Sequence, residues 1–327
     1  MSKLPQFYGV YPVVPTPLKE DESLDLAGME HLVDYYVREG CHGLLVLGSG
    51  GESPYFTLDE KIDIINTVVR KVNKRIPVIA GCTFMSLVEL TSFFKKADST
   101  GVDAFLTALP SYFPLKFEDV YSFYKEIVQR TGKKILYYHF PQITGLYFSA
   151  DQMAMLYGIK GIAGAKESSM WVKEMKRDLQ AMSGRDFSFF SGTGQLLVAT
   201  LAAGGSGTMC TLSAVAPGMA VNCYNSWMAG DKAAARRHEN DIFKHIELLN
   251  TFGMPAAVQT MGFKVISRLP FHTGIGTAAR HAVLKETLRQ LGHPITARVR
   301  SPLPQVTEAD RAGIAALIKR SGHLKAV

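Results

Sequence analysis

The chain has little cysteine and no cysteine pair at a metal-binding or redox spacing. Its cysteines, Cys41, Cys82, Cys210 and Cys223, are scattered among 327 residues, and none belongs to a CxxC pair. Such scattering argues against a zinc site or a disulfide framework. We therefore expect no metal site and a reducing, cytoplasmic compartment.

The sequence also lacks long apolar runs. The N-terminus, MSKLPQFYGVYPVVPTP, has no basic segment followed by the long apolar segment of a secretory signal. No window approaches the ~18 uninterrupted apolar residues that indicate a transmembrane helix. We expect neither secretion nor a membrane partner.

A concentrated basic patch is missing too, although the formal net charge is +7. The basic residues are spread along the chain, apart from short groups such as RKVNKR and RRHENDIFK. Nucleic-acid binding usually requires a focused patch, so no nucleic-acid partner is expected. The charge fits an enzyme of anionic metabolites equally well.

Short apolar runs alternate with segments of helical periodicity through most of the chain. The predicted strands are the apolar runs within residues 8–14, 43–52, 77–82, 103–110, 133–140, 161–166, 187–192 and 204–210. The predicted helices between them are residues 25–40, 57–75, 86–101, 117–132, 149–158, 169–182 and 194–203. Thr57 and Glu60 have the spacing of a capping box at the start of the second helix.

This alternation predicts an α/β fold with a parallel sheet covered by helices. Eight strand–helix units in about 210 residues fit a (β/α)8 barrel, also called a TIM barrel. A doubly wound sheet is the alternative, but no GxGxxG follows the first strand. We expect a catalytic barrel over residues 1–212, with its last helix at about 213–229, and a C-terminal helical extension and tail over 230–327. The extension contains predicted helices at residues 231–250, 255–267, 277–291 and 307–321.

Lys166 lies at the end of the sixth predicted strand, in the segment GIAGAKESS. Most lysines are solvated, so a strand that ends at the surface is the ordinary interpretation. Active sites of TIM barrels, however, form at the C-terminal ends of the strands. Burial disfavours the charged form of an amine, and a neutral amine can attack a ketone to form a Schiff base.

Other reactive groups are predicted at the same end of the barrel. Tyr138 is near the end of the fifth strand, Tyr112 follows the fourth, and Ser49, Gly50 and Gly51 form the turn after the second. A tyrosine hydroxyl can shuttle protons, and a glycine-rich turn can direct N–H groups at a carboxylate.

Each of these elements has a structural interpretation when taken alone. A paired tyrosine such as Tyr138 is more often a core aromatic, and Tyr112 could cap a loop. We expect Glu52 to be a structural carboxylate that holds the turn. Their combination at consecutive strand ends is more specific than any single element.

The ordered motifs resemble the dihydrodipicolinate synthase / N-acetylneuraminate lyase family of class I, Schiff-base-forming aldolases. The likeness extends over about residues 8–290. The motifs that carry it are VVPTPL, GLLVLGSGGESP, LPSYFP, YYHFPQITG, GIAGAKESS and SGTGQLLVATLAAGGSGTM.

The resemblance implies roles for particular residues. Lys166 would form the Schiff base with pyruvate or another 2-oxo acid, and Tyr138 would be the general acid/base. Ser49 and the Gly50 amide would hold the substrate carboxylate, and Tyr112 would act across a tight dimer interface. The family's members are commonly homotetramers, built as dimers of dimers, and they need no metal or organic cofactor.

Departures from the synthase pattern bear on the second substrate. Gly50 replaces the second hydroxyl residue of the synthases, and Ile143 replaces an arginine that grips the aldehyde's carboxylate. Gly194 and Gln195 stand where sialic acid lyases carry an acidic pair.

The pattern is therefore more similar to the 4-hydroxy-2-oxoglutarate and 2-keto-3-deoxy sugar acid aldolases of the family. We expect Ser168, Gly192 and Thr208 to line the pocket of the second substrate. A dehydratase of 2-keto-3-deoxy acids, a true dihydrodipicolinate synthase and a non-catalytic 2-oxo acid sensor are the alternatives.

Overall fold

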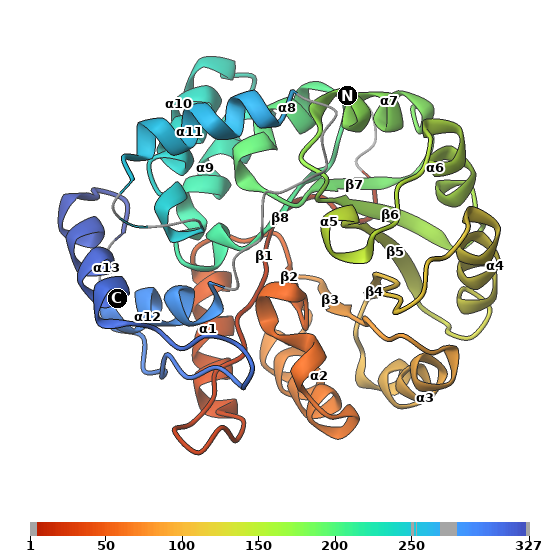
Figure 1. Cartoon of the computed structure of the whole chain (residues 1–327), viewed down its shortest axis with the longest axis horizontal. Helices are drawn as coiled ribbons and strands as arrows, with labels where there is room; N and C mark the ends of the chain where they lie inside the picture. Colours follow the sequence, from red (N-terminus) through yellow and green to blue (C-terminus); the bar gives the residue numbers. More distant parts are fainter. Residues whose placement is uncertain (1–4, 250–251, 253, 269–279, 325–327) are drawn as a thin grey trace.

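Eight parallel strands close into a barrel in the computed structural model of the chain, which describes residues 5–249, 252, 254–268 and 280–324 (Figure 1). The strands are β1 (Gly9–Pro12), β2 (Leu44–Val46), β3 (Val78–Gly81), β4 (Ala104–Thr107), β5 (Lys134–His139), β6 (Ile162–Glu167), β7 (Ser188–Ser191) and β8 (Gly207–Cys210). Neighbours pair in the order β1-β8-β7-β6-β5-β4-β3-β2. A parallel bridge between Val13 and Leu45 joins β1 to β2, and the Val14 N–H donates to the Leu45 carbonyl at 2.9 Å. This closure confirms the predicted TIM barrel.

Helices surround the barrel, as the alternating pattern predicts (Figure 1). They are α1 (Leu26–Arg38), α2 (Leu58–Val72), α3 (Leu87–Ala97), α4 (Phe117–Ile127), α6 (Ala150–Tyr157), α7 (Val172–Ala181), α8 (Leu197–Ala202) and α9 (Pro217–Met228). The predicted capping box of α2 is confirmed, with Thr57 and Glu60 each accepting from the other's backbone N–H. Two orphan N–H groups of the first turn are thereby satisfied.

Two local predictions around the barrel mouth were wrong. The helix expected at residues 169–182 begins only at Val172, because Met170 has a left-handed backbone with φ of 63°. A short helix, α5 (Pro141–Thr144), follows β5 where no helix was predicted. Both differences shape the loops that rise above Lys166 and Tyr138.

The C-terminal helices gather on one side of the barrel (Figure 1). They are α10 (Lys232–Phe243), α11 (Ala256–Ile266), α12 (His281–Gln290) and α13 (Glu308–Arg320). The helix predicted at 231–250 ends at Phe243, and a 3-10 turn at Ile246–Leu248 follows. Residues 277–279 of the helix predicted at 277–291 lie outside the described residues.

Two hydrophobic layers follow from the alternation of side chains along each strand. The cluster inside the barrel includes Tyr11 on β1, Tyr138 on β5, Phe190 on β7 and Met209 on β8. The larger cluster packs the outer strand faces against the helices. Strand register pairs Tyr138 with Lys166 and Lys166 with Phe190, which places Lys166 among inward-facing positions.

The four cysteines are buried and free. Within the described ranges, no group of three metal-ligating side chains occurs. No helix in that part of the chain is long and apolar enough to cross a membrane.

Candidate active site

Lys166 reaches into the barrel mouth from the end of β6. Its side chain is only 3% exposed, and its Nζ lies 4.5 Å from the centre of the Tyr138 ring. The Tyr138 ring stacks on Phe140, with 5.4 Å between ring centres. The lysine amine therefore lies in a buried, aromatic setting at the barrel mouth.

The Tyr138 hydroxyl joins the lysine to the turn after β2. It lies 3.4 Å from the Ser49 Oγ, and either oxygen can be the donor. Lys166, Tyr138 and Ser49 come from three different strand ends, and the structure brings them together. A hydroxyl beside an amine can deliver or accept the protons that Schiff-base chemistry moves.

The turn itself is tight and mostly buried. The Gly51 N–H donates to the Gly48 carbonyl at 2.9 Å, and the Thr16 hydroxyl donates to the Gly51 carbonyl at 2.8 Å. A Cβ at Gly51 would lie 2.8 Å from the Val14 carbonyl oxygen, so a larger residue does not fit. The glycines thus allow the turn to approach β1 closely, with Ser49 facing Tyr138.

Glu52 ends this turn as an entirely buried carboxylate. Its backbone is left-handed, with φ of 61°, and its Oε1 lies 2.5 Å from the Nζ of Lys285 on α12. Both side chains are fully buried. The expectation that Glu52 is structural is confirmed.

Two site-supporting residues were missed by sequence reasoning. Lys285 pairs with Glu52, and the His281 Nε2 lies 2.8 Å from the Ser49 carbonyl oxygen. Both lie on α12, far along the chain from the turn: 232 residues separate His281 from Ser49. No local spacing in the sequence links them to the turn. A lysine on the apolar face of the predicted helix at 277–291 could have indicated a buried ion pair.

The expected second-substrate residues fall into two groups. Ser168 and Gly192 are neighbours: a Cβ at Gly192 would lie 1.9 Å from the Ser168 Oγ. Thr208 is fully buried, and its hydroxyl donates to the Ser191 carbonyl at 3.0 Å. The next residue, Met209, points inward, so Thr208 points to the outer layer and is not brought to Lys166.

Tyr112 stands apart from the other site residues in the single chain. It is 87% exposed and contacts the ring of Phe113, which is 71% exposed. The hydroxyl of Tyr138 is instead next to Ser49. An exposed aromatic pair at the barrel mouth leaves room for a second molecule to cover it.

A buried acidic pair lies behind Lys166, between the strands and helices. Glu167 accepts from the Ser169 N–H at 2.5 Å, and burial raises its pKa well above the ordinary value. Burial also raises the pKa of Asp178 to about 7, although the Tyr157 hydroxyl donates to it at 3.1 Å. Because strand side chains alternate, Glu167 points away from the mouth and is not a partner of Lys166.

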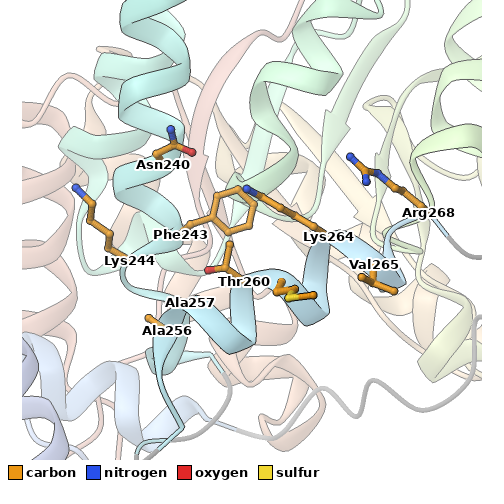
Figure 2. Close-up of a pocket in the computed structure, with 10 residues that line it drawn as sticks. Asn240, Phe243, Lys244, Ala256, Ala257, Thr260, Lys264, Val265 and Arg268 are labelled. Atoms are coloured by element: carbon orange, nitrogen blue, oxygen red, sulfur yellow. The ribbon is translucent and has the colours of Figure 1, made fainter.

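A separate cavity of about 620 Å³ lies between α10 and α11 (Figure 2). Figure 2 shows the Lys264 side chain extending along the Phe243 ring, with 5.1 Å between its Nζ and the ring centre. Lys264 is exposed, and Thr260 is the one hydroxyl residue among those that line the cavity. Lys264 lies on α11, away from the strand ends where TIM-barrel active sites form, so this cavity is not the candidate active site.

Comparison with known proteins agrees with the geometry of the mouth. The sequence model described as the dihydrodipicolinate synthetase family matches residues 6–274. The chain belongs to this family. Members of the dihydrodipicolinate synthetase family are class I aldolases and lyases, so the chain is an enzyme of that class.

Individual relatives show how far the family likeness extends. The chain is 31% identical over 261 residues to a 4-hydroxy-tetrahydrodipicolinate synthase of Ralstonia nicotianae, covering 79% of this chain and 88% of that protein. It is 27% identical to the enzyme of the same name from Bradyrhizobium diazoefficiens, covering 98% and 99%. YagE, a prophage protein of E. coli K12 from the same family, was solved in complex with pyruvate. It shares the fold with a TM-score of 0.84 at 23% identity, covering 97% of this chain and 99% of YagE.

Proposed function

We propose that this enzyme cleaves and forms a carbon–carbon bond next to a Schiff base between Lys166 and a 2-oxo acid. The neutral amine adds to the C2 carbonyl, and loss of water gives an iminium. For a 4-hydroxy-2-oxo acid, removal of the 4-hydroxyl proton then breaks the C3–C4 bond. The bonding electrons move into the iminium to give an enamine, and an aldehyde leaves. Protonation at C3 and hydrolysis release pyruvate and restore the lysine.

The observation that carries the proposal is the trio of Lys166, Tyr138 and Ser49. The amine faces the Tyr138 ring at 4.5 Å, and the phenol oxygen lies 3.4 Å from the Ser49 Oγ. These distances support Tyr138 as the group that would shuttle protons between the lysine and the substrate oxygens. Ser49 and the Gly50 amide would hold the carboxylate of the 2-oxo acid. Pyruvate in the complex of YagE is consistent with this substrate class.

As the substrate that is cleaved, we propose a 4-hydroxy-2-oxo acid or a 2-keto-3-deoxy sugar acid. Ile143 is 54% exposed at the position of the synthase arginine, and the neighbouring Phe140 is buried. An isoleucine offers no bidentate partner to a carboxylate on the aldehyde. Ser168 and Gly192, which contact each other beside Lys166, are the proposed lining of this half of the pocket.

A second candidate is 4-hydroxy-tetrahydrodipicolinate synthase, because relatives at 27% and 31% identity carry that name. The same lysine and tyrosine would serve pyruvate in that reaction. Ile143 disfavours it, since the aldehyde's carboxylate would lack the guanidinium that the synthase pattern provides.

We also propose a homotetramer, built as a dimer of dimers, in the cytoplasm. The support is Tyr112, whose 87% exposure is unusual for an aromatic side chain at an active-site mouth. In a tight dimer, Tyr112 of one copy would reach the site of the other and relay protons to Tyr138.

Product identification tests the choice between the two functions. The enzyme is incubated with 4-hydroxy-2-oxoglutarate or a 2-keto-3-deoxy sugar acid, and released pyruvate and aldehyde are measured. A parallel reaction supplies pyruvate and an aldehyde, other than glyoxylate, that carries a carboxylate. Glyoxylate is left out because it is itself the aldehyde that 4-hydroxy-2-oxoglutarate releases. Cleavage with aldehyde release supports the proposed aldolase. Strong, saturable turnover only in the parallel reaction would contradict it and favour the synthase.

A further inference from the structure

The segment from α12 to α13 contacts the carboxylate-binding turn at several points. His281 reaches the Ser49 carbonyl, and Lys285 reaches Glu52. Farther along, Arg300 donates to the Tyr55 carbonyl at 2.9 Å and pairs with Glu60 at 2.5 Å. The turn after β2 is therefore enclosed by a part of the chain that lies beyond the barrel strands.

The contact with Ser49 determines which ring nitrogen of His281 carries a hydrogen. A carbonyl oxygen only accepts hydrogen bonds, so the His281 Nε2 donates to the Ser49 oxygen at 2.8 Å. Burial lowers the pKa of His281, which favours the neutral ring. The same carbonyl also accepts from the Glu52 N–H at 3.1 Å. Ser49 is thus held at its backbone by His281, while its hydroxyl faces Tyr138.

α12 is itself rigidly anchored. The Lys285 Nζ pairs with Glu52 and donates to the Arg298 carbonyl at 2.7 Å. Glu286, fully buried in the next position, pairs with Arg311 of α13 at 2.9 Å. A side chain on such a helix can set the position of a loop, because its own rotamer and backbone have little freedom.

We propose that His281 is a positioning residue of the active site, which holds Ser49 where a substrate carboxylate is bound. The inference rests on the proposed function, since it assigns a task to the turn of that same site. Lys166 lies on β6, whereas His281 contacts the turn after β2, so loss of the His281 donor loosens the carboxylate site and leaves the nucleophile in place. The tail beyond residue 290 gains a role as the support of α12.

The test measures borohydride trapping of pyruvate on the full chain as a function of pyruvate concentration. Three variants are compared with the wild type: H281A, H281Q and the control H323A, whose histidine lies in the same tail beside Asp241. We expect H281A to raise the half-saturating pyruvate concentration roughly fivefold to tenfold, the effect of one hydrogen bond. The trapping rate at saturation should change less than about twofold, because the nucleophile is unaffected.

A rescuing variant and a ketone without a carboxylate distinguish a positioning role of His281 from a general loss of structure. The side-chain amide of H281Q can donate to the Ser49 carbonyl, so this variant should return most of the affinity. Acetone lacks the carboxylate, so the rate at which H281A is trapped with acetone should match the wild type. If H281A does not fold, H281M removes the donor while keeping bulk.

The possible failures are distinguishable. If the wild type forms no pyruvate adduct on Lys166, the proposed function is wrong, and this inference falls with it. If the wild type is trapped but H281A shows unchanged half-saturation, only the positioning role is overturned. Equal losses with pyruvate and acetone, or no rescue in H281Q, would likewise reject positioning in favour of a purely structural histidine.

Discussion

Around the barrel mouth, Ser49 and Glu52 after β2 form a side that is held by side chains from α12, whereas Tyr112 after β4 and Ile143 after β5 form a side that is exposed. The held side contains a fully buried ion pair, and each of its backbone carbonyls at Ser49 and Gly51 accepts a side-chain hydrogen bond. The exposed side presents Tyr112 at 87% and Ile143 at 54%. The two parts of the mouth therefore differ in how far the chain encloses them.

We attribute the difference to the two tasks that we propose for the site. A 2-oxo acid carboxylate needs donors held in a fixed geometry, because preorganised donors lose little freedom on binding. The variable part of a substrate needs a surface that can differ among relatives. We therefore expect the held side to serve the step that the family's members share. We expect the exposed side to determine which aldehyde is accepted, or to be covered by a second copy of the chain.

The largest effect should come from removing the proton shuttle between the two sides. Tyr138→Phe deletes the hydroxyl next to Ser49 and should lower kcat by about 10²- to 10⁴-fold. Steady-state kinetics on a cleaved 2-oxo acid measures it. Tyr11→Phe is the matched control, since Tyr11 also lies inside the barrel and its ring lies against Gly43, just before β2 begins. Equal kcat in Tyr138→Phe and the wild type would remove Tyr138 from the mechanism.

Breaking the buried ion pair tests how strongly the held side depends on α12. Lys285→Met leaves the Glu52 charge buried and alone, which should cost about 3–5 kcal/mol of unfolding free energy. Denaturant unfolding measures it. Lys96→Met removes a charge from an exposed pair with Asp59 and should cost less than about 1 kcal/mol. Similar losses of unfolding free energy in both variants would show that the buried pair stabilises the fold no more than an exposed pair does.

The double variant refines this result. Glu52→Gln with Lys285→Met removes both charges and should recover part of the stability that Lys285→Met loses, because no buried charge remains unpaired. Additive losses in the double variant would show that the two residues act independently of each other.

Converting the exposed side tests its role in substrate choice. Ile143→Arg supplies a guanidinium that can bind a carboxylate with two hydrogen bonds. We expect kcat/KM for a carboxylate-bearing aldehyde to rise at least about tenfold relative to an uncharged aldehyde, the lower end of what charged hydrogen bonds give. Ile143→Leu keeps an apolar side chain and should leave the ratio unchanged. An unchanged ratio in Ile143→Arg would place the second substrate elsewhere.

The smallest effect concerns the salt bridge that holds the tail over the turn. Arg300 lowers the pKa of Glu60 to about 2 from an ordinary value of 4.5. The folded pKa is depressed, so this stability is present above pH 4.5 and is lost as pH falls toward 2. Since the pair is partly exposed, Arg300→Gln should cost about 1 kcal/mol at pH 6.

Unfolding at two pH values checks this contribution. The difference in unfolding free energy between the wild type and Arg300→Gln should be smaller at pH 3.5 than at pH 6. Arg70→Gln removes a mostly exposed charge beside Glu30 and should differ from the wild type by less than about 0.5 kcal/mol at both. A difference that grows as pH falls would contradict the assignment to the Arg300–Glu60 pair.

The sequence could predict the barrel because its evidence is local. Each strand is a continuous apolar run, and signals such as the Thr57 capping box mark where helices begin. Lys166, Tyr138 and Ser49 were also predictable, since parallel strands that close into a barrel bring their C-terminal ends together. Register, and with it the inward direction of each side chain, then follows from alternation.

What escaped prediction depends on contacts between distant segments or on single-residue geometry. Alternation applied to Thr208 would have shown it facing outward, but the start of β8 at Gly207 was not fixed by the glycine-rich sequence. The left-handed Met170 delays α7, and nothing in its residue type indicates that. His281 and Lys285 reach the turn only through the packing of α12, which no spacing in the chain encodes.

We claim that Lys166 is the Schiff-base nucleophile, and borohydride trapping decides this. The enzyme is incubated with pyruvate, reduced with borohydride and analysed by intact mass and peptide mapping. We predict a pyruvate-sized adduct on Lys166 that disappears in Lys166→Ala and persists in Lys264→Ala, whose lysine is exposed on α11. Absence of an adduct with pyruvate and with longer 2-oxo acids, or an adduct on another lysine, would contradict the claim.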